Sequence, residues 1–475
     1  MSKQAAPSLV WFRQDLRLAD NPALLAAIER NAPMAAAYVL DDDAPGKWKM
    51  GGASRWWLHH SLKSLTADLK RLDIPLVLRR GSAKTIIPKL AEEIGAGAVF
   101  WNRCYEPFAV DRDARIAAGL AKAGVGVQDF PATLLTEPGT VENKSGKPFR
   151  VFTPYARAVL KQGHPATPKP APRAGQSHGR IGSDELNDWK LLPTHPNWAS
   201  AFGDDWTPGE SGAQDQLKTF IEDALEHYPT GRNLPGREGV SRLSPHLHWG
   251  EISVRQIWHA VELHSGNAAD TYLKELVWRD FAHQLLDQFP ALPDEPFTPR
   301  YAQFPWRKDA KALKAWQTGQ TGYPFVDAGM RQLWTTGWMH NRVRMVVASF
   351  LVKHLLLPWQ AGEDWFWDCL VDADLAINAM NWQWVAGSGA DAAPYFRIFN
   401  PVLQGEKFDK DGAYVRHWVP EIAKLPDTWL HKPWLAPAGI LAKAGVRLGM
   451  TYPQPIVDHD TGRQRALDAL KTIRK

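Results

Sequence analysis

The sequence predicts an α/β domain followed by a large helical domain. Three observations support this fold class. At 475 residues, the chain exceeds the length that one hydrophobic core usually serves. Short apolar runs alternate with amphipathic stretches in residues 1–132, and helical periodicity dominates from residue 214 onward. Hydrophobic residues form 44% of the chain, which suits full-sized cores and argues against disorder.

Five apolar runs in the first part of the chain predict strands, and four amphipathic stretches between them predict helices. Alternation of this kind is typical of a parallel sheet that helices cover on both faces. The predicted strands are residues 9–12, 35–40, 76–78, 98–101 and 125–130. The predicted helices are residues 22–30, 55–72, 85–94 and 112–123.

The first turn from strand to helix, residues 13–20, reads RQDLRLAD. It lacks the Gly-x-Gly-x-x-Gly sequence that holds a dinucleotide phosphate. A nicotinamide-dependent dehydrogenase is therefore unsupported.

A long connection is predicted after the α/β domain, because residues 163–212 hold seven prolines and show no sustained periodicity. We expect an α/β domain over residues 1–132, a linker over residues 133–213 and a helical domain over residues 214–475. The clearest later helices are residues 214–227, 270–288 and 341–357.

Composition excludes several classes of protein. The two cysteines, Cys104 and Cys369, are too few for a disulfide framework or for a four-cysteine zinc or iron–sulfur site, and they suit a reducing cytosol. The first residues have no signal-peptide core, and no uncharged apolar run is long enough for a membrane helix. We therefore expect a cytoplasmic protein with no membrane partner and no bound metal.

The charge balance is only weak evidence about partners. The chain has 56 basic and 51 acidic residues, a formal net charge of +5. This balance permits binding to nucleic acid and does not establish it, because many proteins are mildly basic.

Residues 228–250 are rich in glycine, which lets the backbone approach a ligand closely. Ser241, Arg242 and Ser244, with Pro245 at a predicted helix start, offer hydroxyls, a guanidinium and free amides that could hold a diphosphate. An ordinary capped loop has the same features. On this segment alone the ordinary loop is favoured, by roughly two to one.

Helical spacing places Asn341 and Met345 on one face of the predicted helix, and His340 and Arg344 on the neighbouring face. The pattern suits a helix with two functional sides, but also a helix with a solvated basic edge.

Residues 372–378 leave a similar choice between a functional and a structural interpretation. Asp372, Asp374 and Asn378 could bind ligand hydroxyls or pair with Arg344, or the two acids could simply stabilise a helix start.

Twelve of the 23 tryptophans lie between residues 306 and 434, where any one of them is most often core filling. Glu275 and Arg279 could form an intrahelical ion pair worth only a few tenths of a kcal/mol. His246 and His248 lack a third ligand and are interpreted as structural. Hydrolysis is unsupported, because the chain has no Gly-x-Ser-x-Gly or His-Glu-x-x-His sequence.

Four stretches between residues 322 and 401 together resemble the signature of the photolyase/cryptochrome flavoproteins. They are GYPFVDAGMRQLW (322–334), WMHNRVRM (338–345), DADLAINAMNWQW (372–384) and PYFRIFNP (394–401). The resemblance extends from residues 9–24 to residues 452–457. It implies a Rossmann-like domain for a light-harvesting antenna and an all-helical domain that binds FAD.

The resemblance also implies roles for individual residues. FAD would be bound by Tyr228, Ser241, Arg242, Leu243, Ser244, Arg279, Arg344, Asp372, Asp374 and Asn378. Electrons would reach the flavin through Trp382, Trp359 and Trp306. The catalytic contacts to a DNA lesion would come from Glu275, Trp278, Asn341, Met345 and Trp384, and Asn378 would be catalytic through its amide near N5 of the flavin. Arg232 and Arg342 would join Trp278, Asn341 and Trp384 in binding DNA.

The implied activity is that of a cyclobutane pyrimidine dimer photolyase of the bacterial class III branch, near the plant cryptochromes. In that family, blue light drives an electron from FADH⁻ to a flipped-out pyrimidine dimer, the cyclobutane ring opens and the electron returns. Trp278 and Trp384 match residues that clamp the dimer, where stacking is worth about 1–3 kcal/mol per base. We expect a monomer that acts on UV-damaged DNA in the bacterial cytosol, associated with the nucleoid.

Two rival functions follow from the same resemblance. A photolyase for (6-4) lesions should have histidines at positions 341 and 345, where this chain has Asn341 and Met345. A cryptochrome photoreceptor usually has a long tail, and plant receptors typically have Asp at the position of Asn378. Both rival functions are less favoured, because this chain lacks the two histidines and has Asn378 where plant receptors have Asp.

Two details depart from the family pattern. His354 stands where several members have an acidic partner for the residue that matches Arg344. Residues 101–108 (WNRCYEPF) do not reproduce the Asn–Glu pair that binds a folate in class I enzymes. 5,10-Methenyltetrahydrofolate is still the expected antenna, with a deazaflavin or no antenna as alternatives.

Overall fold

The computed structural model describes residues 5–391 and 396–473. Its contacts divide the chain into two compact units. Unit 1 consists of Met1–Glu222, Ser241–Pro290 and Val371–Leu375, and unit 2 consists of Asp223–Val240, Ala291–Leu370 and Ala376–Lys475. The expected domain boundaries at residues 132 and 213 stay a prediction. The first two residues of the expected signature segment 394–401 lie outside the described residues.

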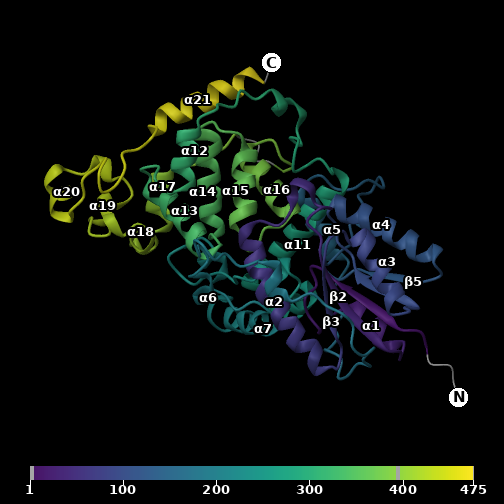
Figure 1. Cartoon of the computed structure of the whole chain (residues 1–475). Coiled ribbons are helices and arrows are strands. Elements are labelled where there is room, and N and C mark those ends of the chain that lie inside the picture. Colours follow the sequence, from purple (N-terminus) through teal and green to yellow (C-terminus); the bar gives the residue numbers. More distant parts are fainter. Residues whose placement is uncertain (1–4, 392–395, 474–475) are drawn as a thin grey trace. The chain divides into compact units, whose positions relative to one another are not determined.

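A five-stranded parallel sheet forms the centre of unit 1 (Figure 1). Its strand order is β3-β2-β1-β4-β5, and Leu9 of β1 lies opposite Ala35 of β2 and Val99 of β4. All five predicted strands are present, with ends that differ by at most two residues. They are β1 (Ser8–Phe12), β2 (Met34–Leu40), β3 (Leu76–Arg80), β4 (Ala98–Asn102) and β5 (Gly126–Phe130).

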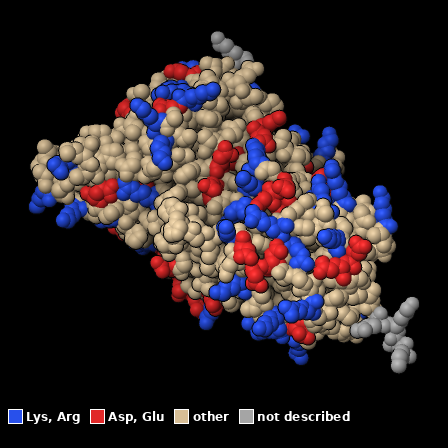
Figure 2. Space-filling model, in the orientation of Figure 1, with Lys and Arg blue, Asp and Glu red and all other residues tan. Residues whose placement is uncertain are grey.

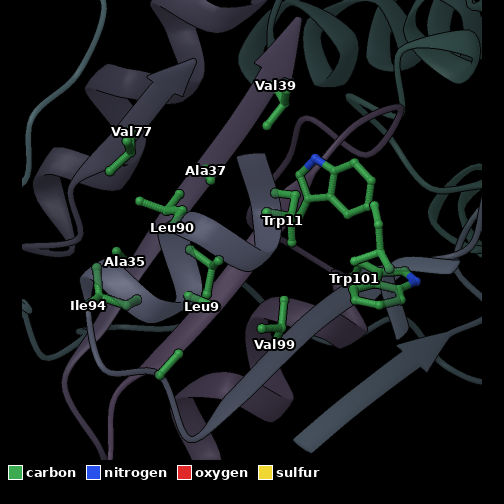
Figure 3. Packing of buried hydrophobic residues seen from close by; sticks show 14 of the residues in the cluster. Leu9, Trp11, Ala35, Ala37, Val39, Val77, Leu90, Ile94, Val99 and Trp101 are labelled. Atoms are coloured by element: carbon green, nitrogen blue, oxygen red, sulfur yellow. The ribbon is translucent and has the colours of Figure 1, made fainter. Parts of the chain in front are cut away.

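The four predicted crossover helices are also present. They are α1 (Pro22–Glu29), α2 (Gly52–Arg71), α3 (Ala83–Glu93) and α4 (Pro107–Lys122). Alternate strand residues, among them Leu9, Trp11 and Val99, point to one face of the sheet and pack against Leu90 and Ile94 at the end of α3 (Figure 3). This alternation follows from the two-residue repeat of a strand, and it buries one core between the sheet and the pair α3 and α4.

The chain order reverses between β1 and β4, at the crevice where open α/β sheets usually bind nucleotides. Polar side chains contact one another beside this point. Nη1 of Arg13 donates to Asp113 at 2.9 Å, and its guanidinium lies 4.2 Å from the ring of Trp11. Nδ2 of Asn102 donates to Oδ2 of Asp15 at 2.6 Å. These polar contacts involve residues of the turn 13–20, which lacks the Gly-x-Gly-x-x-Gly sequence.

Unit 1 also contains helices other than the four crossover helices. The 22-residue α11 is buried on several sides, so it serves as a central support rather than as a surface helix. The helix α10 begins with a capping box between Ser253 and Gln256. These elements are η1 (Gly46–Trp48), α5 (Phe152–Lys161), η2 (Leu186–Trp189), α6 (Phe202–Asp205), α7 (Glu210–Thr219), α9 (Ser244–His248), α10 (Val254–Glu262) and α11 (Asn267–Gln288), with the π-helical η3 (Phe220–Ala224) at the end of the first segment.

Unit 2 is helical throughout its described part (Figure 1). The predicted helix 341–357 is divided there into an α-helix and a π-helical segment. The elements are α8 (Tyr228–Gly231), η4 (Pro299–Gln303), α12 (Ala310–Gln317), α13 (Pro324–Thr336), α14 (Asn341–Ser349), η5 (Phe350–His354), α15 (Trp359–Cys369), α16 (Leu375–Ala386), α17 (Pro401–Phe408), α18 (Ala413–Trp418), η6 (Pro420–Ile422), α19 (Asp427–Leu430), η7 (Pro433–Leu435), α20 (Ala438–Ala444) and α21 (His459–Thr472).

The predicted fold class is confirmed, because a parallel-sheet α/β part is followed by a largely helical part. Within the described ranges, no helix combines the length and the apolar character needed to span a membrane.

Candidate functional site

The predicted phosphate-binding segment, residues 228–250, is divided between the units, and its residues Ser241, Arg242 and Ser244 lie in unit 1. Arg242 has a left-handed backbone (φ 51°), and its guanidinium lies 3.4 Å from Oδ1 of Asp205 and 4.4 Å from the ring of Trp206. The carbonyl oxygen of Ser241 accepts a hydrogen bond from Gln216 at 3.0 Å. Leu243 is fully buried and anchors the turn.

Ser244 and Asp372 are brought together from distant parts of the sequence. The hydroxyl of Ser244 donates to Oδ2 of Asp372 at 2.6 Å. Ser244 is the first residue of α9 and is exposed, whereas Asp372 is buried. A carboxylate fixed in this way can accept further hydrogen bonds from ligand hydroxyls.

Asp374 is the centre of a buried charged cluster in unit 1. Its Oδ2 lies 3.5 Å from Nε2 of His283 and 3.8 Å from Nδ1 of His248. Burial opposes the charge, but the imidazole groups of His283 and His248 and the charge of Arg279 together hold the pKa of Asp374 well below its ordinary value. Burial lowers the pKa of His283 against the pull of Asp374. A His283 ring with a lowered pKa is a poor source of positive charge for Asp374. Arg279 is permanently charged, so we favour an ionised Asp374.

Three predicted site residues lie along α11. Nη1 of Arg279 donates to the carbonyl oxygen of Thr133 at 2.6 Å. Glu275 is half-buried one turn earlier. The indole of Trp278 lies flat against the ring of Phe152, with a centroid distance of 3.5 Å and an interplanar angle of 7°.

The predicted lesion-binding helix, α14, lies in unit 2. His340 caps it, and Nδ1 of His340 accepts a hydrogen bond from the amide of Arg342 at 3.2 Å. Asn341 is exposed at the first position of the helix. Nη1 of Arg342 lies 3.8 Å from the sulfur of Met345, and its Nη2 donates to Asn233. Arg344 turns the other way, and its Nε donates to the carbonyl oxygen of Met339 at 2.7 Å.

Positive charge gathers around the start of α14. Burial lowers the pKa of Arg342, and the charges of Arg232 and Arg397 lower it further. The pKa of His340 falls to about 3 because the ring is buried and Arg342, Arg344 and Arg232 are close by. We call Arg232, Arg342, Arg344 and Arg397 the arginine cluster. Like charges held together disfavour one another, so the cluster favours binding of an anion.

The arginine cluster is local. On the face drawn in Figure 2, Lys and Arg are interleaved with Asp and Glu rather than gathered into one broad patch. Arg397 was missed from the sequence, although it lies in the signature segment 394–401. Spacing along the chain gives no signal that it lies near Arg342.

The predicted tryptophans and Asn378 occupy different surroundings in unit 2. Trp382 is buried against Phe366, at a ring distance of 5.0 Å. Trp359 is buried at the start of α15, whereas Trp306 is half-buried 4.4 Å from the ring of Phe304. Trp384 is half-buried on α16. On the same helix, Nδ2 of the buried Asn378 donates to the carbonyl oxygen of Glu363 at 3.1 Å.

The remaining predicted residues lie in α8 and η5. Tyr228 is buried at the start of α8, and the guanidinium of Arg232 lies 5.3 Å from its ring. His354 contacts the C-terminal helix, because its Nε2 lies 2.8 Å from Nδ1 of His459.

The donor and acceptor types of these residues fit a ligand with phosphates, hydroxyls and ring carbonyl groups. In unit 2, Nδ1 of His340 is an acceptor, so Nε2 carries the proton. This buried Nε2 has no hydrogen-bond partner among the described residues. In unit 1, the ionised Asp374 and the fixed Asp372 supply acceptors for hydroxyl groups. His248 and His283 lie beside Asp374. From the sequence, His248 was interpreted as structural and His283 was not singled out.

Comparisons with known proteins agree with this chemistry. Residues 8–173 match the family model described as DNA photolyase, and residues 272–472 match the model described as FAD binding domain of DNA photolyase. The chain is 51% identical over 481 residues to the deoxyribodipyrimidine photo-lyase of Agrobacterium fabrum (strain C58), and the match covers both chains completely. It is 38% identical over 485 residues to cryptochrome-1 of Arabidopsis thaliana, which covers 98% of this chain and 70% of that relative.

The fold is similar to the crystal structure of a bacterial class III photolyase from Agrobacterium tumefaciens. The TM-score is 0.96 at 50% identity, over 100% of this chain and 99% of the other. The expected similarity to class III photolyases and plant cryptochromes is therefore confirmed. From its sheet-containing N-terminal part to its FAD-binding C-terminal part, the chain belongs to the DNA photolyase/cryptochrome family.

Proposed function

We propose that the chain is a light-driven enzyme that splits cyclobutane pyrimidine dimers in DNA. The observation that carries this proposal is the 51% identity, over its whole length, to a deoxyribodipyrimidine photo-lyase. When bound, the reduced flavin would supply the electron that opens the cyclobutane ring and would take that electron back afterwards. The protein would therefore need no other reductant during repair.

The proposed cofactor residues of unit 1 act by hydrogen bonding and charge. Asp372, held by Ser244, accepts hydrogen bonds from hydroxyl groups of the cofactor. Arg279, Ser241, Arg242 and Leu243 place donors and backbone around its phosphates. Asp374 stays ionised because His248, His283 and Arg279 surround it.

The proposed cofactor residues of unit 2 are Tyr228, Arg344 and Asn378. The amide of Asn378 is held at Nδ2 by the Glu363 carbonyl oxygen, so its side-chain oxygen is oriented to act as an acceptor. The guanidinium of Arg344 is also held in one orientation, because its Nε donates to the carbonyl oxygen of Met339. Trp382, Trp359 and Trp306 are proposed to carry electrons that reduce the cofactor.

The proposed DNA site uses the arginine cluster for phosphates and polar or aromatic groups for the lesion. Arg232 and Arg342 would bind backbone phosphates, which position the duplex but carry no information about the lesion. Asn341, Met345, Glu275, Trp278 and Trp384 would contact the extruded dimer. Extrusion costs least at a damaged site, where pairing is already weak.

Three finer proposals follow from family membership. The antenna is 5,10-methenyltetrahydrofolate, which absorbance and fluorescence of the purified holoprotein would identify. The protein acts as a monomer, which its mass in solution would test. It works in the cytosol with the nucleoid, where its DNA substrate is located and where two free cysteines stay reduced.

The first experiment uses the reduced holoprotein and an oligonucleotide that carries one thymine dimer. Blue light should restore the ultraviolet absorbance of thymine, while a sample kept in the dark should not change. No recovery with reduced flavin bound would favour a cryptochrome-type photoreceptor, because the chain is also 38% identical to cryptochrome-1 of Arabidopsis thaliana. Repair of a (6-4) lesion instead of a dimer would favour the other rival function.

A further inference from the structure

The ring of Phe152 occupies one face of Trp278. The centroid distance of 3.5 Å and the interplanar angle of 7° place the two rings in full parallel contact. A nucleobase stacks on an aromatic side chain with the same parallel geometry, so it cannot share this face with Phe152. Only the opposite face of the indole is left for a base.

Two helices of unit 1 hold this stack in place. Phe152 and Tyr155 are three residues apart on α5, and Trp278 and Phe281 are three residues apart on α11, so each pair lies on one side of its helix. The ring of Tyr155 lies 5.3 Å from that of Phe281, and Trp278 meets Phe281 edge-on at 5.8 Å. The four rings therefore pack as two successive layers between the helices.

Hydrogen bonds fix the spacing of these layers. The hydroxyl groups of Tyr155 and Thr136 are 2.9 Å apart. Thr136 in turn donates from its amide to Oδ2 of Asp280 at 2.8 Å, and Asp280 lies on α11 beside the aromatic pair. Because both helices are tied to Thr136, the ring of Phe152 is held against Trp278 with little freedom to turn.

We propose that Phe152 is a positioning residue for lesion recognition, which holds the indole of Trp278 in the plane that an extruded pyrimidine stacks on. This inference rests on the proposed function, because it assumes that Trp278 contacts the dimer. Phe152 itself touches no base. Without Phe152, the Trp278 side chain would lose rotational freedom when the dimer binds, and this loss would weaken binding. Phe152 removes that freedom before the dimer binds.

The test measures binding in the dark, where no repair occurs. The holoprotein is titrated with an oligonucleotide that carries one thymine dimer and with the same oligonucleotide undamaged, and the ratio of the two Kd values is the readout. Phe152→Leu keeps an apolar side chain but removes the flat ring, and it should reduce the preference for damaged DNA about twofold to tenfold. Phe152→Tyr keeps the ring and should restore the preference.

Phe149→Leu is the matched control. Phe149 belongs to the same aromatic group through its 6.1 Å contact with Tyr155, whereas the ring stacked on Trp278 is that of Phe152. Its replacement should leave the ratio unchanged. Thermal unfolding of each variant separates stability from recognition, because a merely structural role would lower Tm without changing the ratio.

The outcomes separate this inference from the proposed function. If Trp278→Leu removes the preference while Phe152→Leu retains it, Phe152 is only a core residue and the inference is overturned. If Trp278→Leu also retains the preference, Trp278 does not bind the lesion and the inference fails with that assignment. If the unchanged protein shows neither a preference nor light-dependent repair, the proposed function fails first.

Discussion

Arg232 belongs to the arginine cluster, whose charges act on one another and on His340. If the cluster binds DNA phosphates, Arg232→Gln should weaken binding to damaged and undamaged DNA by the same factor. The slope of log K against log salt should fall by about one, because one phosphate contact is lost. Titrations at several salt concentrations measure both quantities.

Lys89→Gln is the control for this prediction, since it removes the same charge from an exposed position on α3. It should leave affinity and salt slope unchanged. A loss confined to damaged DNA in Arg232→Gln would mean that Arg232 reads the lesion and not the backbone.

Asn341 and Met345 are the residues that distinguish the proposed function from (6-4) repair. The double variant Asn341→His with Met345→His should abolish dimer repair, because it replaces an amide and a thioether by two bulky rings near Arg342. Recovery of thymine absorbance under blue light measures this. Full activity in the double variant would remove both residues from the lesion site.

Asn378 offers a test that depends on a single proton. In Asn378→Asp, a carboxyl group would face the carbonyl oxygen of Glu363, which cannot donate a hydrogen bond. The new carboxyl group should therefore keep its proton, and its pKa should rise. A raised folded-state pKa stabilises the protein below the unfolded value near 4, and this contribution is lost as the pH rises. We expect the variant to lose about 1–3 kcal/mol of unfolding free energy between pH 4 and pH 8 relative to the unchanged protein.

Asn381→Asp is the matched control for this measurement. Asn381 also donates from Nδ2 to a backbone carbonyl, that of Ile377 at 2.9 Å, but it is exposed to water. Its replacement should show little dependence on pH. Equal pH dependence of the two variants would contradict the prediction.

The helices α15 and α16 contact each other closely at Gly362 and Trp382, so a methyl group added at Gly362 tests this contact directly. A Cβ at Gly362 would lie 2.1 Å from Cη2 of Trp382. Gly362→Ala should therefore displace the indole and lower the unfolding free energy by about 1–3 kcal/mol, despite the better helix propensity of alanine. Chemical denaturation measures this. If Trp382 carries electrons, light-driven reduction of the flavin should slow as well.

Gly119→Ala is the matched control on α4, where an added Cβ meets no atom within 4 Å. It should raise the unfolding free energy by about 0.5–1 kcal/mol, because alanine favours a helix over glycine. A stabilising effect in both variants would show that Trp382 moves freely.

The elements themselves were largely predictable from the sequence. Strands such as β2 are short, apolar and bounded by turn residues, so their limits were predicted to within two residues. The helix predicted over residues 341–357 continues as the π-helical η5 from Phe350, where Lys353 and His354 are both buried. Hydrophobic periodicity assumes that polar residues face water, so it gives no warning of a wider turn that buries two of them.

The site was predictable only in part, because its partners come from distant segments. Residue types and the family resemblance indicated Asp374 and Trp278. They did not indicate that His283 lies beside Asp374 or that Phe152 covers Trp278. Each of these pairs is more than 90 residues apart in the sequence, so only tertiary packing brings them together.

Across the whole molecule, buried neutral histidines should make stability depend on pH. Burial, with His459 and Arg465, lowers the pKa of His354 to about 3, and the pKa of His340 is also about 3. Between pH 6.5 and pH 3 the unfolded chain binds protons at these sites and the folded chain does not. The unfolding free energy should therefore fall as the pH falls through this range, by about 2–5 kcal/mol for each histidine.

Denaturant titrations at pH 7, 6, 5 and 4 test this prediction. His354→Gln should flatten the dependence, because one of the two sites no longer binds a proton on unfolding. His417→Gln is the control, since His417 is exposed on α18. An unchanged pH dependence in His354→Gln would show that His354 is already protonated in the folded protein.

The polar contacts beside β1 and β4 bear on the energy source that this protein would use. Arg13, Asp113, Asn102 and Asp15 contact one another near the point where open α/β sheets in general bind nucleotides. On the proposed function, turnover would be limited by photon flux and would not respond to the energy charge of the cell. Repair should then continue in starved cells for as long as they are illuminated.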